Sequence, residues 1–376
     1  MNITIIGAGI GGLTTAIALK QKGFEVELFE AAPEIREVGA GISLAFNAMQ
    51  VYQHLGLAET IRQAGYQASR MKITDAKLKP ISCIDLAPFY QKYGVPVVAI
   101  HRGVLQKKLV ENLEGTAIHL HKKLKAIEKD DKALILHFED GTQHSAQLLI
   151  GADGIHSPTR NYVYPEAQLR DAHQPCWRGI THFELPAAQQ HQLLEMWGKG
   201  KRFGFTHIDG QRVYWYALVN QKADSADINL AATFQDFNPL VGQIIESTPT
   251  DKIIKADLID LKPIDRWHTD NICLIGDAAH ATTPNMGQGA CQAIEDAWVL
   301  SNCLAKDAPP LAFQKFQALR MPKAKKVVNM SWQIGGLAHW ENSIGVWLRN
   351  ALLRATPKSI AQRQNEWIYE VNAGGA

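Results

Sequence analysis

Two glycine-rich segments, one at the start of the chain and one late in it, carry the residue types best suited to hold a long phosphate-containing cofactor. Gly7, Gly9 and Gly12 follow the apolar run 3–6 in the pattern GxGxxG. There the first glycine allows a tight turn, the second lets the backbone approach a pyrophosphate, and the third lets a helix pack closely on a strand. Glu30 ends the next apolar run, where a carboxylate accepts hydrogen bonds from ribose hydroxyls and repels a 2′-phosphate. The N-terminus therefore predicts a site for the adenosine half of a dinucleotide.

The late segment suits a polyol and a redox-active ring. Asp277 follows Gly276 directly after a predicted strand, and a carboxylate there can accept hydrogen bonds from a ribityl chain. Gly287 and Gly289 then open a predicted helix, whose first backbone N–H groups can face a ring carbonyl. The positive end of the helix dipole would stabilise negative charge on that ring, as in a reduced flavin. A loop–helix junction with a solvated aspartate is the alternative interpretation.

A third segment, residues 151–160 with the sequence GADGIHSPTR, follows the apolar run 148–150. Asp153 and Gly154 form a turn signal, and Ser157 suits the N-cap of a short helix. By itself this segment is more typical of a structural turn than of a binding site.

Composition excludes several classes of function. The net charge of +2 gives no reason to expect a nucleic acid partner. No apolar run approaches the ~20 residues that a membrane-spanning helix needs, and the N-terminus lacks the basic region of a signal peptide. The five cysteines form no CxxC pair and the 14 histidines show no metal-ligand spacing. We therefore expect a cytoplasmic protein with reduced thiols and no metal.

Hydrophobic periodicity predicts an α/β protein. Residues 3–30 have the pattern of a strand, a helix and a second strand. Strand-like alternation dominates 123–150 and 173–219, and helical patterns dominate from about residue 289 to the end. The nucleotide-binding elements stand on both sides of the strand-rich part, so the latter is predicted to be an inserted domain.

The segments 7–12, 151–160 and 273–277, in this order, resemble the three hallmark motifs of the single-component FAD-dependent aromatic hydroxylases, the p-hydroxybenzoate hydroxylase-like flavin monooxygenases. The resemblance covers essentially the whole chain. It implies tightly bound FAD, NAD(P)H as a transient co-substrate, and O2, used to hydroxylate an aromatic or heteroaromatic small molecule through a flavin C4a-hydroperoxide. By residue, it implies cofactor contacts from Gly7, Gly9, Gly12, Glu30, Arg102, Asp153, Asp277, Gly287, Gly289 and Ala290.

The fold that this resemblance implies is a Rossmann-like FAD-binding domain with an inserted β-sheet substrate domain and C-terminal helices. We expect the FAD-binding domain in 1–70, 97–178 and 266–330, the substrate domain in 71–96 and 179–265, and the helical segment in 331–376. The sequence has no second GxGxxG for a nicotinamide cofactor, which fits a transient encounter of NAD(P)H with the flavin. The protein is expected to be a monomer or a homodimer.

Two branches of the family resemble the chain most. Gly200-Lys201-Arg202 followed by Tyr214 resembles the FAD-dependent urate hydroxylases, in which this arginine and tyrosine lie at the substrate. The segments 176–178, 197–202 and 340–350 resemble the alkylquinolone 3-monooxygenases more closely. The resemblance thus favours a bulkier, quinolone-like substrate over urate.

Arg202 and Tyr214 are the catalytic candidates that the resemblance implies. Arg202 would hold an enolate or phenolate oxygen and Tyr214 would donate a hydrogen bond. If the hairpin turns at 209–210, Arg202 opposes residue 217 and Tyr214 points to the other face. If it turns at 208–210, with Gly210 left-handed, Arg202 opposes residue 216 and shares its face with Tyr214, while His207 lies opposite. The substrate role requires the latter, and a surface arginine beside a core tyrosine is the alternative.

Other interpretations stay open. A flavin oxidase or dehydrogenase acting on an amine or alcohol shares the first motif but usually lacks the segment 151–160. A non-catalytic protein of the Rab-GDP dissociation inhibitor type lacks the Gly276-Asp277 motif and would purify colourless. His280 is expected to be satisfied locally. Trp332, Trp340 and Trp347 would suit either a membrane-facing helix or, as we expect, a helical layer packed on the body.

Overall fold

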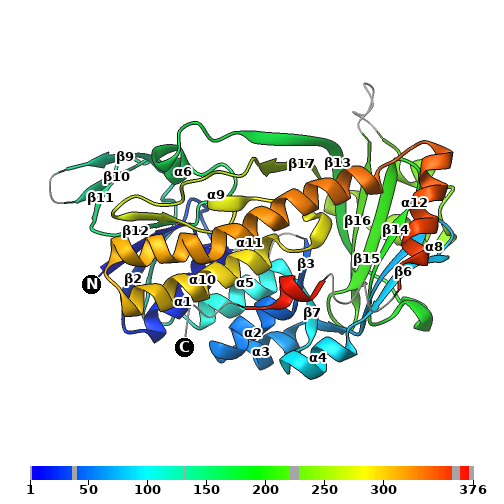
Figure 1. Ribbon diagram of the computed structural model, residues 1–376, viewed down its shortest axis with the longest axis horizontal. Coiled ribbons are helices and arrows are strands. Elements are labelled where there is room, and N and C mark those ends of the chain that lie inside the picture. The colour runs from blue at the N-terminus through cyan, green and yellow to red at the C-terminus, as the bar shows by residue number, and fades with distance from the viewer. Residues whose placement is uncertain (1, 36–39, 131–132, 221–227, 358–364, 372–376) are drawn as a thin grey trace.

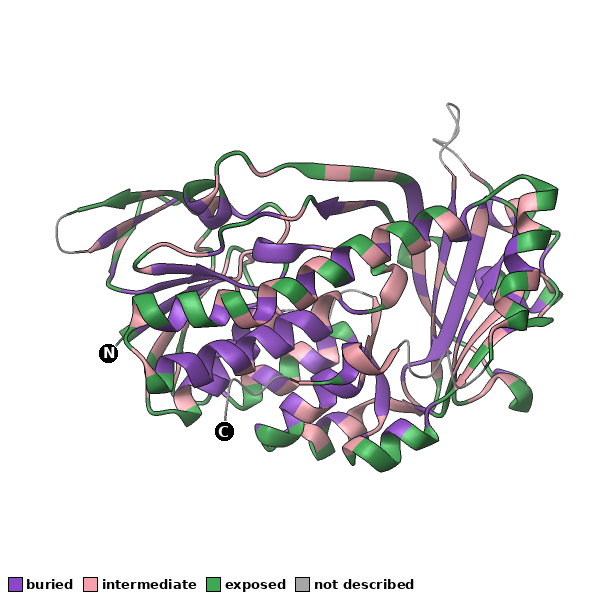
Figure 2. Cartoon of the chain, viewed as in Figure 1, coloured by how far each residue is buried: buried purple, intermediate pink, exposed green. Residues whose placement is uncertain are grey.

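The computed structural model describes residues 2–35, 40–130, 133–220, 228–357 and 365–371. In Figure 1 a body of helices and parallel strands fills the left, a mostly antiparallel sheet stands at the right, and helix α11 (Pro309–Ala338) runs along the body towards that sheet. Figure 2 shows buried residues concentrated where the helices meet the strands of the body and along the sheet at the right. The α/β fold class expected from the sequence is confirmed.

A five-stranded parallel sheet gathers strands from the start, the middle and the late part of the chain, in the order β18-β12-β1-β2-β8. Ile6 at the end of β1 pairs with Gly151 at the end of β12, and Gly151 pairs with Leu274 at the end of β18. Because parallel strands share a carboxyl edge, the three motif segments meet there. The strands are β1 Asn2–Ile6, β2 Glu25–Phe29, β8 Ala117–His119, β12 Leu149–Gly151 and β18 Ile272–Leu274.

Helices cover this sheet and attach the start of the chain to its late part. α1 packs against α10 so closely that a β-carbon at Gly11 would lie 3.2 Å from the Cβ of Ala293. α10 in turn packs against α11, so the expected helical layer on the body is present as far as α11. Trp340 and Trp347 lie beyond α11 and are exposed by 43% and 69%, so the packed layer does not extend to them. The helices are α1 Ile10–Gln21, α2 Phe46–His54, α3 Ala58–Ala64, α4 Ala87–Tyr93, α5 Arg102–Glu111, α6 Pro158–Val163, α9 Asp277–His280, η3 Pro284–Met286 and α10 Gly289–Lys306.

Two further sheets have three strands each. One has the order β3-β7-β4, with β3 Gly41–Leu44, β4 Tyr66–Ala68 and β7 Val97–His101. The other has the order β11-β10-β9, with β9 Leu124–Lys129, β10 Leu134–Phe138 and β11 Gln143–Ala146.

A seven-stranded sheet in the order β17-β13-β16-β15-β14-β5-β6 forms the other half of the molecule. On one face Phe203, Trp215 and Val241 belong to a core between the sheet and α8. Tyr214 and Tyr216, which alternate with Trp215 along β16, point to the opposite face. The elements are β5 Arg70–Asp75, β6 Pro80–Asp85, β13 Leu169–His182, η1 Ala187–Gln189, β14 Gln192–Trp197, β15 Lys201–His207, β16 Arg212–Val219, α7 Leu230–Thr233, α8 Pro239–Glu246, η2 Thr250–Lys252 and β17 Ile254–Leu261.

The β15–β16 hairpin has a register that neither sequence alternative anticipated. Arg202 pairs with Leu218, because the loop comprises residues 209–211. The carboxylate of Asp209 accepts hydrogen bonds from the backbone N–H groups of Gln211 and Arg212, at 2.9 and 2.7 Å. This aspartate-capped turn moves the loop one residue towards the C-terminus, and Gly210 is not left-handed. The predicted pairing was therefore wrong.

Helix α12 (Ser343–Ala355) packs on β6, and residues 365–369, in the last described segment, are again helical. α11 runs without a break past residue 330, where a boundary was expected. The domain ranges stay a prediction. Of the helices within the described residues, none has the length and apolar content needed to cross a membrane.

A buried charge network joins α10, α11 and the loop after β18. Asp296 accepts hydrogen bonds from the backbone N–H of Gly276 at 2.9 Å and from Nε of Arg320 at 2.7 Å, and it contacts Nε2 of His280 at 2.6 Å. Arg320 also donates to Glu295 at 2.6 Å. Burial alone would raise the pKa of Asp296, but His280 and Arg320 outweigh it and hold that pKa below its ordinary value. His280 is thus satisfied locally, as expected.

We expect Arg320→Met to lower the free energy of unfolding by about 3–5 kcal/mol, because it leaves two buried carboxylates without their guanidinium partner. Urea denaturation followed by tryptophan fluorescence measures this effect. The matched control is Arg62→Met, which breaks an exposed pair with Glu59 and should cost less than about 1 kcal/mol. Equal effects of the two substitutions would contradict a structural role for the network.

Candidate active site

A cavity of about 1090 Å³ lies between the carboxyl edge of the parallel sheet and the inner face of the seven-stranded sheet. Its volume is slightly above the roughly 300–1,000 Å³ typical of small-molecule sites. Gly9, Ala152 and Asp277 line it, one from each of the three motif segments. Arg202 and Tyr214 line it from the seven-stranded sheet. The cavity therefore brings the predicted cofactor and substrate residues to one space.

The glycines of the first motif are fixed by backbone contacts. Gly7 has φ +102°, and a β-carbon there would overlap the carbonyl oxygen of Ala152. A β-carbon at Gly12 would overlap the carbonyl oxygen of Gly7. At Gly9, by contrast, a β-carbon would meet nothing within 4 Å, because this glycine faces the cavity. The cradle thus keeps open the space that a pyrophosphate needs.

Two predicted cofactor carboxylates are held by backbone and hydroxyl groups. Glu30 accepts hydrogen bonds from the backbone N–H groups of Ala8 and Ala32, at 2.7 and 2.8 Å. Asp153 accepts from the hydroxyl of Ser157 and from the hydroxyl of Thr159 at 2.7 Å. Burial raises the pKa of Asp153, and these hydrogen bonds only partly offset it. Both side chains fix turns at the edge of the cavity without lining it.

Asp277 and Arg102 face the cavity itself. Among the described residues, Asp277 has no hydrogen-bond partner, so its carboxylate is free for a polyol. Enclosure by protein raises the pKa of Asp277, while the charges of His280, Arg102 and Arg160 counter that rise. Arg102 begins α5 directly after His101, whose Nδ1 caps the helix by accepting from Gly103 N at 3.1 Å. These groups suit the ribityl and phosphate parts of a flavin cofactor.

The N-terminus of α10 supplies the amide groups expected for the ring. Gly287 is left-handed, with φ +62°, and turns the chain from η3 into the helix. Gly289 and Ala290 line the cavity with the first turn of α10, an 18-residue helix. The first N–H groups of a helix have no intrahelical acceptor and carry its positive dipole end. A ring carbonyl and negative charge on the ring would both be stabilised here.

Arg202 lies on the same sheet face as Tyr214, but its charge is already matched. Its Nη1 donates to Oε1 of Glu195 at 3.0 Å and its Nη2 donates to Oδ1 of Asn285 at 2.6 Å. Glu195 also accepts from the hydroxyl of Tyr216 at 2.7 Å. Arg202 is 1% exposed, and its Nε has no partner among the described residues. Through Asn285, the predicted substrate arginine therefore links β15 to the segment that precedes α10, and this structural contact already occupies part of its guanidinium.

Arg178, expected from the sequence only as part of the segment 176–178 and not as a site residue, is the second cation of this corner. It lies on β13 opposite Tyr216 and lines the cavity, and its Nε donates to Sγ of Cys176 at 3.4 Å. No carboxylate of the described residues forms an ion pair with it. Burial raises the pKa of Tyr214 while Arg178 opposes the rise, so the phenol stays protonated. The sequence did offer one signal for Arg178: it stands two residues after Cys176 in a predicted strand, so the two side chains share a face of the sheet.

The cavity continues into an apolar branch at the far end of the seven-stranded sheet. Side chains of β5, β6, α11 and α12 form its walls, and Trp197 adds an aromatic face. The branch residues are Ile73, Ile81, Trp197, Ile334, Leu337 and Leu353. Such walls exclude water and suit a hydrocarbon chain.

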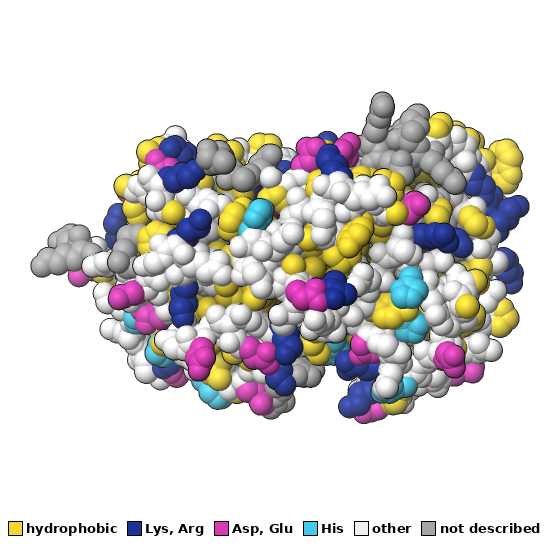
Figure 3. Space-filling model, turned by 90° about the horizontal axis from the view of Figure 1, so that it is seen from below, with side chains coloured by type: hydrophobic (Ala, Val, Ile, Leu, Met, Phe, Trp, Pro, Cys, Tyr) yellow, Lys and Arg dark blue, Asp and Glu magenta, His cyan; other side chains and the backbone are white. Residues whose placement is uncertain are grey.

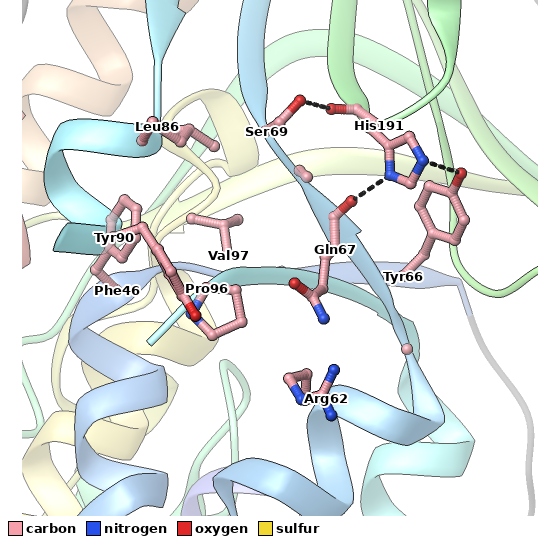
Figure 4. Close-up of a pocket in the computed structure, with 13 residues that line it drawn as sticks. Phe46, Arg62, Tyr66, Gln67, Ser69, Leu86, Tyr90, Pro96, Val97 and His191 are labelled. Carbon is pink, nitrogen blue, oxygen red and sulfur yellow. Dashed lines mark hydrogen bonds between the residues drawn. The ribbon is translucent and has the colours of Figure 1, made fainter. Parts of the chain in front are cut away.

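A second pocket, of about 550 Å³, holds none of the predicted site residues and shares only Val97 with the large cavity. In Figure 4 His191 lies beside Tyr66 and Gln67, and its ring nitrogens contact the Tyr66 hydroxyl and the Gln67 carbonyl, both at 3.1 Å. His207 packs its ring against Tyr66 from the sheet face opposite Arg202, and burial lowers the pKa of His207. This histidine is therefore structural.

Comparisons with known proteins identify the family of the chain. A family model described as "FAD binding domain" matches residues 1–331. Aurachin C monooxygenase/isomerase of Stigmatella aurantiaca is 34% identical over 94% of this chain and 94% of its own length. The 2-heptyl-3-hydroxy-4(1H)-quinolone synthase of Pseudomonas aeruginosa (strain UCBPP-PA14) is 32% identical over 98% of both chains. The crystal structure of Klebsiella pneumoniae HpxO complexed with FAD and uric acid has a TM-score of 0.90 at 28% identity, over 97% of this chain and 95% of that chain.

We expect Gly9→Ala to lower bound FAD at least about tenfold, which corresponds to roughly 1.4 kcal/mol. The added β-carbon meets no protein atom, so folding is preserved while the pyrophosphate space is reduced. Flavin absorbance per purified chain measures occupancy, and circular dichroism checks the fold. Gly242→Ala, on α8 with equally open surroundings, is the control and should keep its flavin. Full occupancy in Gly9→Ala would contradict the assignment.

Proposed function

Since this chain belongs to the FAD binding domain family and is an FAD-dependent aromatic monooxygenase, we propose that its substrate is a quinolone-like heteroaromatic ring with a hydrocarbon tail. One observation carries the proposal: a single cavity joins a cationic corner around Arg178 to the apolar branch described above. A ring that bears an oxygen fits the first part, and its tail fits the second.

The residues present suit FAD. Gly9 leaves room for the pyrophosphate, and Gly12 lets the start of α1 approach the backbone of Gly7. Asp277 would accept from the ribityl hydroxyls, and the first turn of α10 would donate to the ring. When bound, FAD accepts a hydride from NAD(P)H and activates O2 for transfer of one oxygen atom to the substrate. The protein's part is to orient the substrate ring, exclude water and place charge.

We assign the substrate oxygen to Arg178 and Tyr214. The guanidinium of Arg178 would stabilise an enolate or phenolate form of the ring, which makes the carbon beside that oxygen more nucleophilic. Tyr214, protonated at neutral pH, would donate a hydrogen bond to the same oxygen. Arg202 would act as a positioning residue. Its Nη1 is paired with Glu195, and its Nη2 holds Asn285 in place beside the substrate space.

A urate-type hydroxylase is the second candidate, since Arg202 and Tyr214 share a sheet face and HpxO with uric acid bound has the same fold. Two features favour the quinolone-like substrate. Arg202 is held in an ion pair, and urate would leave the apolar branch without an occupant. A flavin oxidase would differ from both, because its turnover would not depend on NAD(P)H.

We expect Arg178→Met to lower kcat/KM for 2-heptyl-4-quinolone about 100-fold, the usual effect of removing a donor that stabilises a developing oxyanion. Bound FAD should be unchanged, and Arg178→Lys should recover part of the loss. NAD(P)H oxidation with product detection measures this, across quinolones, urate and hydroxybenzoates. Arg202→Met is the comparison: a larger loss there than in Arg178→Met, with FAD retained, would return the substrate role to Arg202.

We also expect kcat/KM to rise along a series of 2-alkyl-4-quinolones by up to about fourfold for each added CH2, since burying one contributes about 0.8 kcal/mol. Leu337→Trp should flatten the series by filling the apolar branch. The control Leu311→Trp, exposed on α11 and outside the cavity, should leave it unchanged. Turnover that does not depend on tail length would contradict this use of the branch.

A further inference from the structure

Helix α12 buries two polar side chains and exposes most of its large apolar ones, unlike an ordinary surface helix. Arg349 and Asn350 are buried, with 2% and 8% of their surface exposed. Ile344, Trp347 and Leu352 are exposed by 75%, 69% and 62%. Residues spaced three and four apart share one face of a helix, so these apolar side chains, with Leu348, form a continuous outward stripe.

This arrangement is built into the packing of α12. The Nη1 of Arg349 donates to the carbonyl oxygens of Leu337 and Ala338, at 3.2 and 2.9 Å, and so caps the end of α11. The Arg349 guanidinium also lies over the ring of Trp197, 5.1 Å from its centroid. Arg349, together with Leu353, which packs on Ile81 and Trp197, anchors the inward face of α12, and the apolar stripe faces outward.

Basic side chains border the stripe at both ends. Lys199 donates from Nζ to Oγ of Ser343 at 2.8 Å, where α12 begins. Near its end, Arg354 donates to the carbonyl of Pro80 at 3.0 Å and pairs with Asp75. Lys77 and Lys79, both exposed, stand between Asp75 and Pro80 in the sequence, in the turn that joins β5 to β6. Figure 3 shows Lys and Arg side chains beside hydrophobic ones at the right-hand end, where Figure 1 places α12.

We propose that α12 lies in the interface of an anionic phospholipid bilayer, with the stripe among the acyl chains and the lysines at the headgroups. A tryptophan on an apolar face with a basic border is the usual composition of interfacial helices. A second copy fits this surface less well, because a two-fold contact would place the same lysines against each other.

The large cavity begins where the outward stripe of α12 ends. Leu353, Arg354 and Thr356 at the end of α12 line the large cavity next to its apolar branch. A substrate with a hydrocarbon tail therefore passes from the bilayer to the cavity along one helix; this step rests on the proposed function, whereas the membrane contact does not.

Flotation of the FAD-loaded protein with phospholipid vesicles tests the proposal. We expect binding to phosphatidylcholine vesicles that contain about one quarter phosphatidylglycerol, and weaker binding to phosphatidylcholine alone or at high salt. The double variant Trp347→Ser/Leu352→Ser should lose at least about tenfold in partitioning, because it removes two inserted side chains. Lys77→Gln/Lys79→Gln should remove the preference for the anionic lipid.

Leu311→Ser is the matched control, since this leucine is also exposed, by 45%, but lies at the opposite end of α11. It should bind vesicles as the unaltered protein does. The proposal is overturned if neither vesicle binds, if the double variant binds equally well, or if the protein is a dimer that the double variant dissociates.

Turnover of a water-soluble short-chain quinolone without vesicles separates the two proposals. If turnover is normal and no vesicle binds, only the membrane contact is wrong. If vesicles bind and no quinolone stimulates NAD(P)H oxidation, only the proposed substrate is wrong.

Discussion

One buried carboxylate, that of Asp296, fixes the geometry on which the cofactor site depends. It binds the backbone N–H of Gly276, contacts His280 and pairs with Arg320. These partners belong to the loop after β18, to the short helix α9 that follows it and to α11, while Asp296 itself belongs to α10. Since α9 begins with Asp277 and the same α10 offers its N-terminal amides, the two groups that would meet the flavin are held at a fixed separation. The buried charge network around Asp296 thus fixes the positions of the cofactor groups that line the cavity.

The second organising feature is the alternation of β16. Trp215 packs into the core with α8, and its neighbours Tyr214 and Tyr216 enter the cavity. The same strand therefore stabilises the seven-stranded sheet and equips the substrate corner. Charge is divided there as well: Glu195 matches Arg202 and leaves Arg178 as the cation available to a ligand. Burial explains why this division matters, since an unmatched guanidinium in an enclosed site attracts an anionic oxygen strongly.

The parts of the site that were predictable from sequence are those set by backbone geometry. Gly7 and Gly12 are required by overlaps with carbonyl oxygens, so the pattern of residue types already describes their surroundings. Pairings between distant side chains leave no such trace. Neither the Glu195 partner of Arg202 nor the cavity position of Arg178 follows from spacing. The hairpin register was missed because a single aspartate moved the turn by one residue, and the outward stripe of α12 depends on Arg349 finding the end of α11.

The strand order of the parallel sheet has a consequence for how the protein is made. β1 lies between β12 and β2, and β12 needs β18, which the ribosome synthesises only after the whole seven-stranded sheet. The nucleotide cradle therefore emerges early but stays without its neighbours until α10 and α11 have followed. Contacts between residues so far apart in the chain form slowly, and their exposed strands are prone to aggregate meanwhile. Flavin supply and chaperones would thus act on this chain mainly after its synthesis is nearly complete.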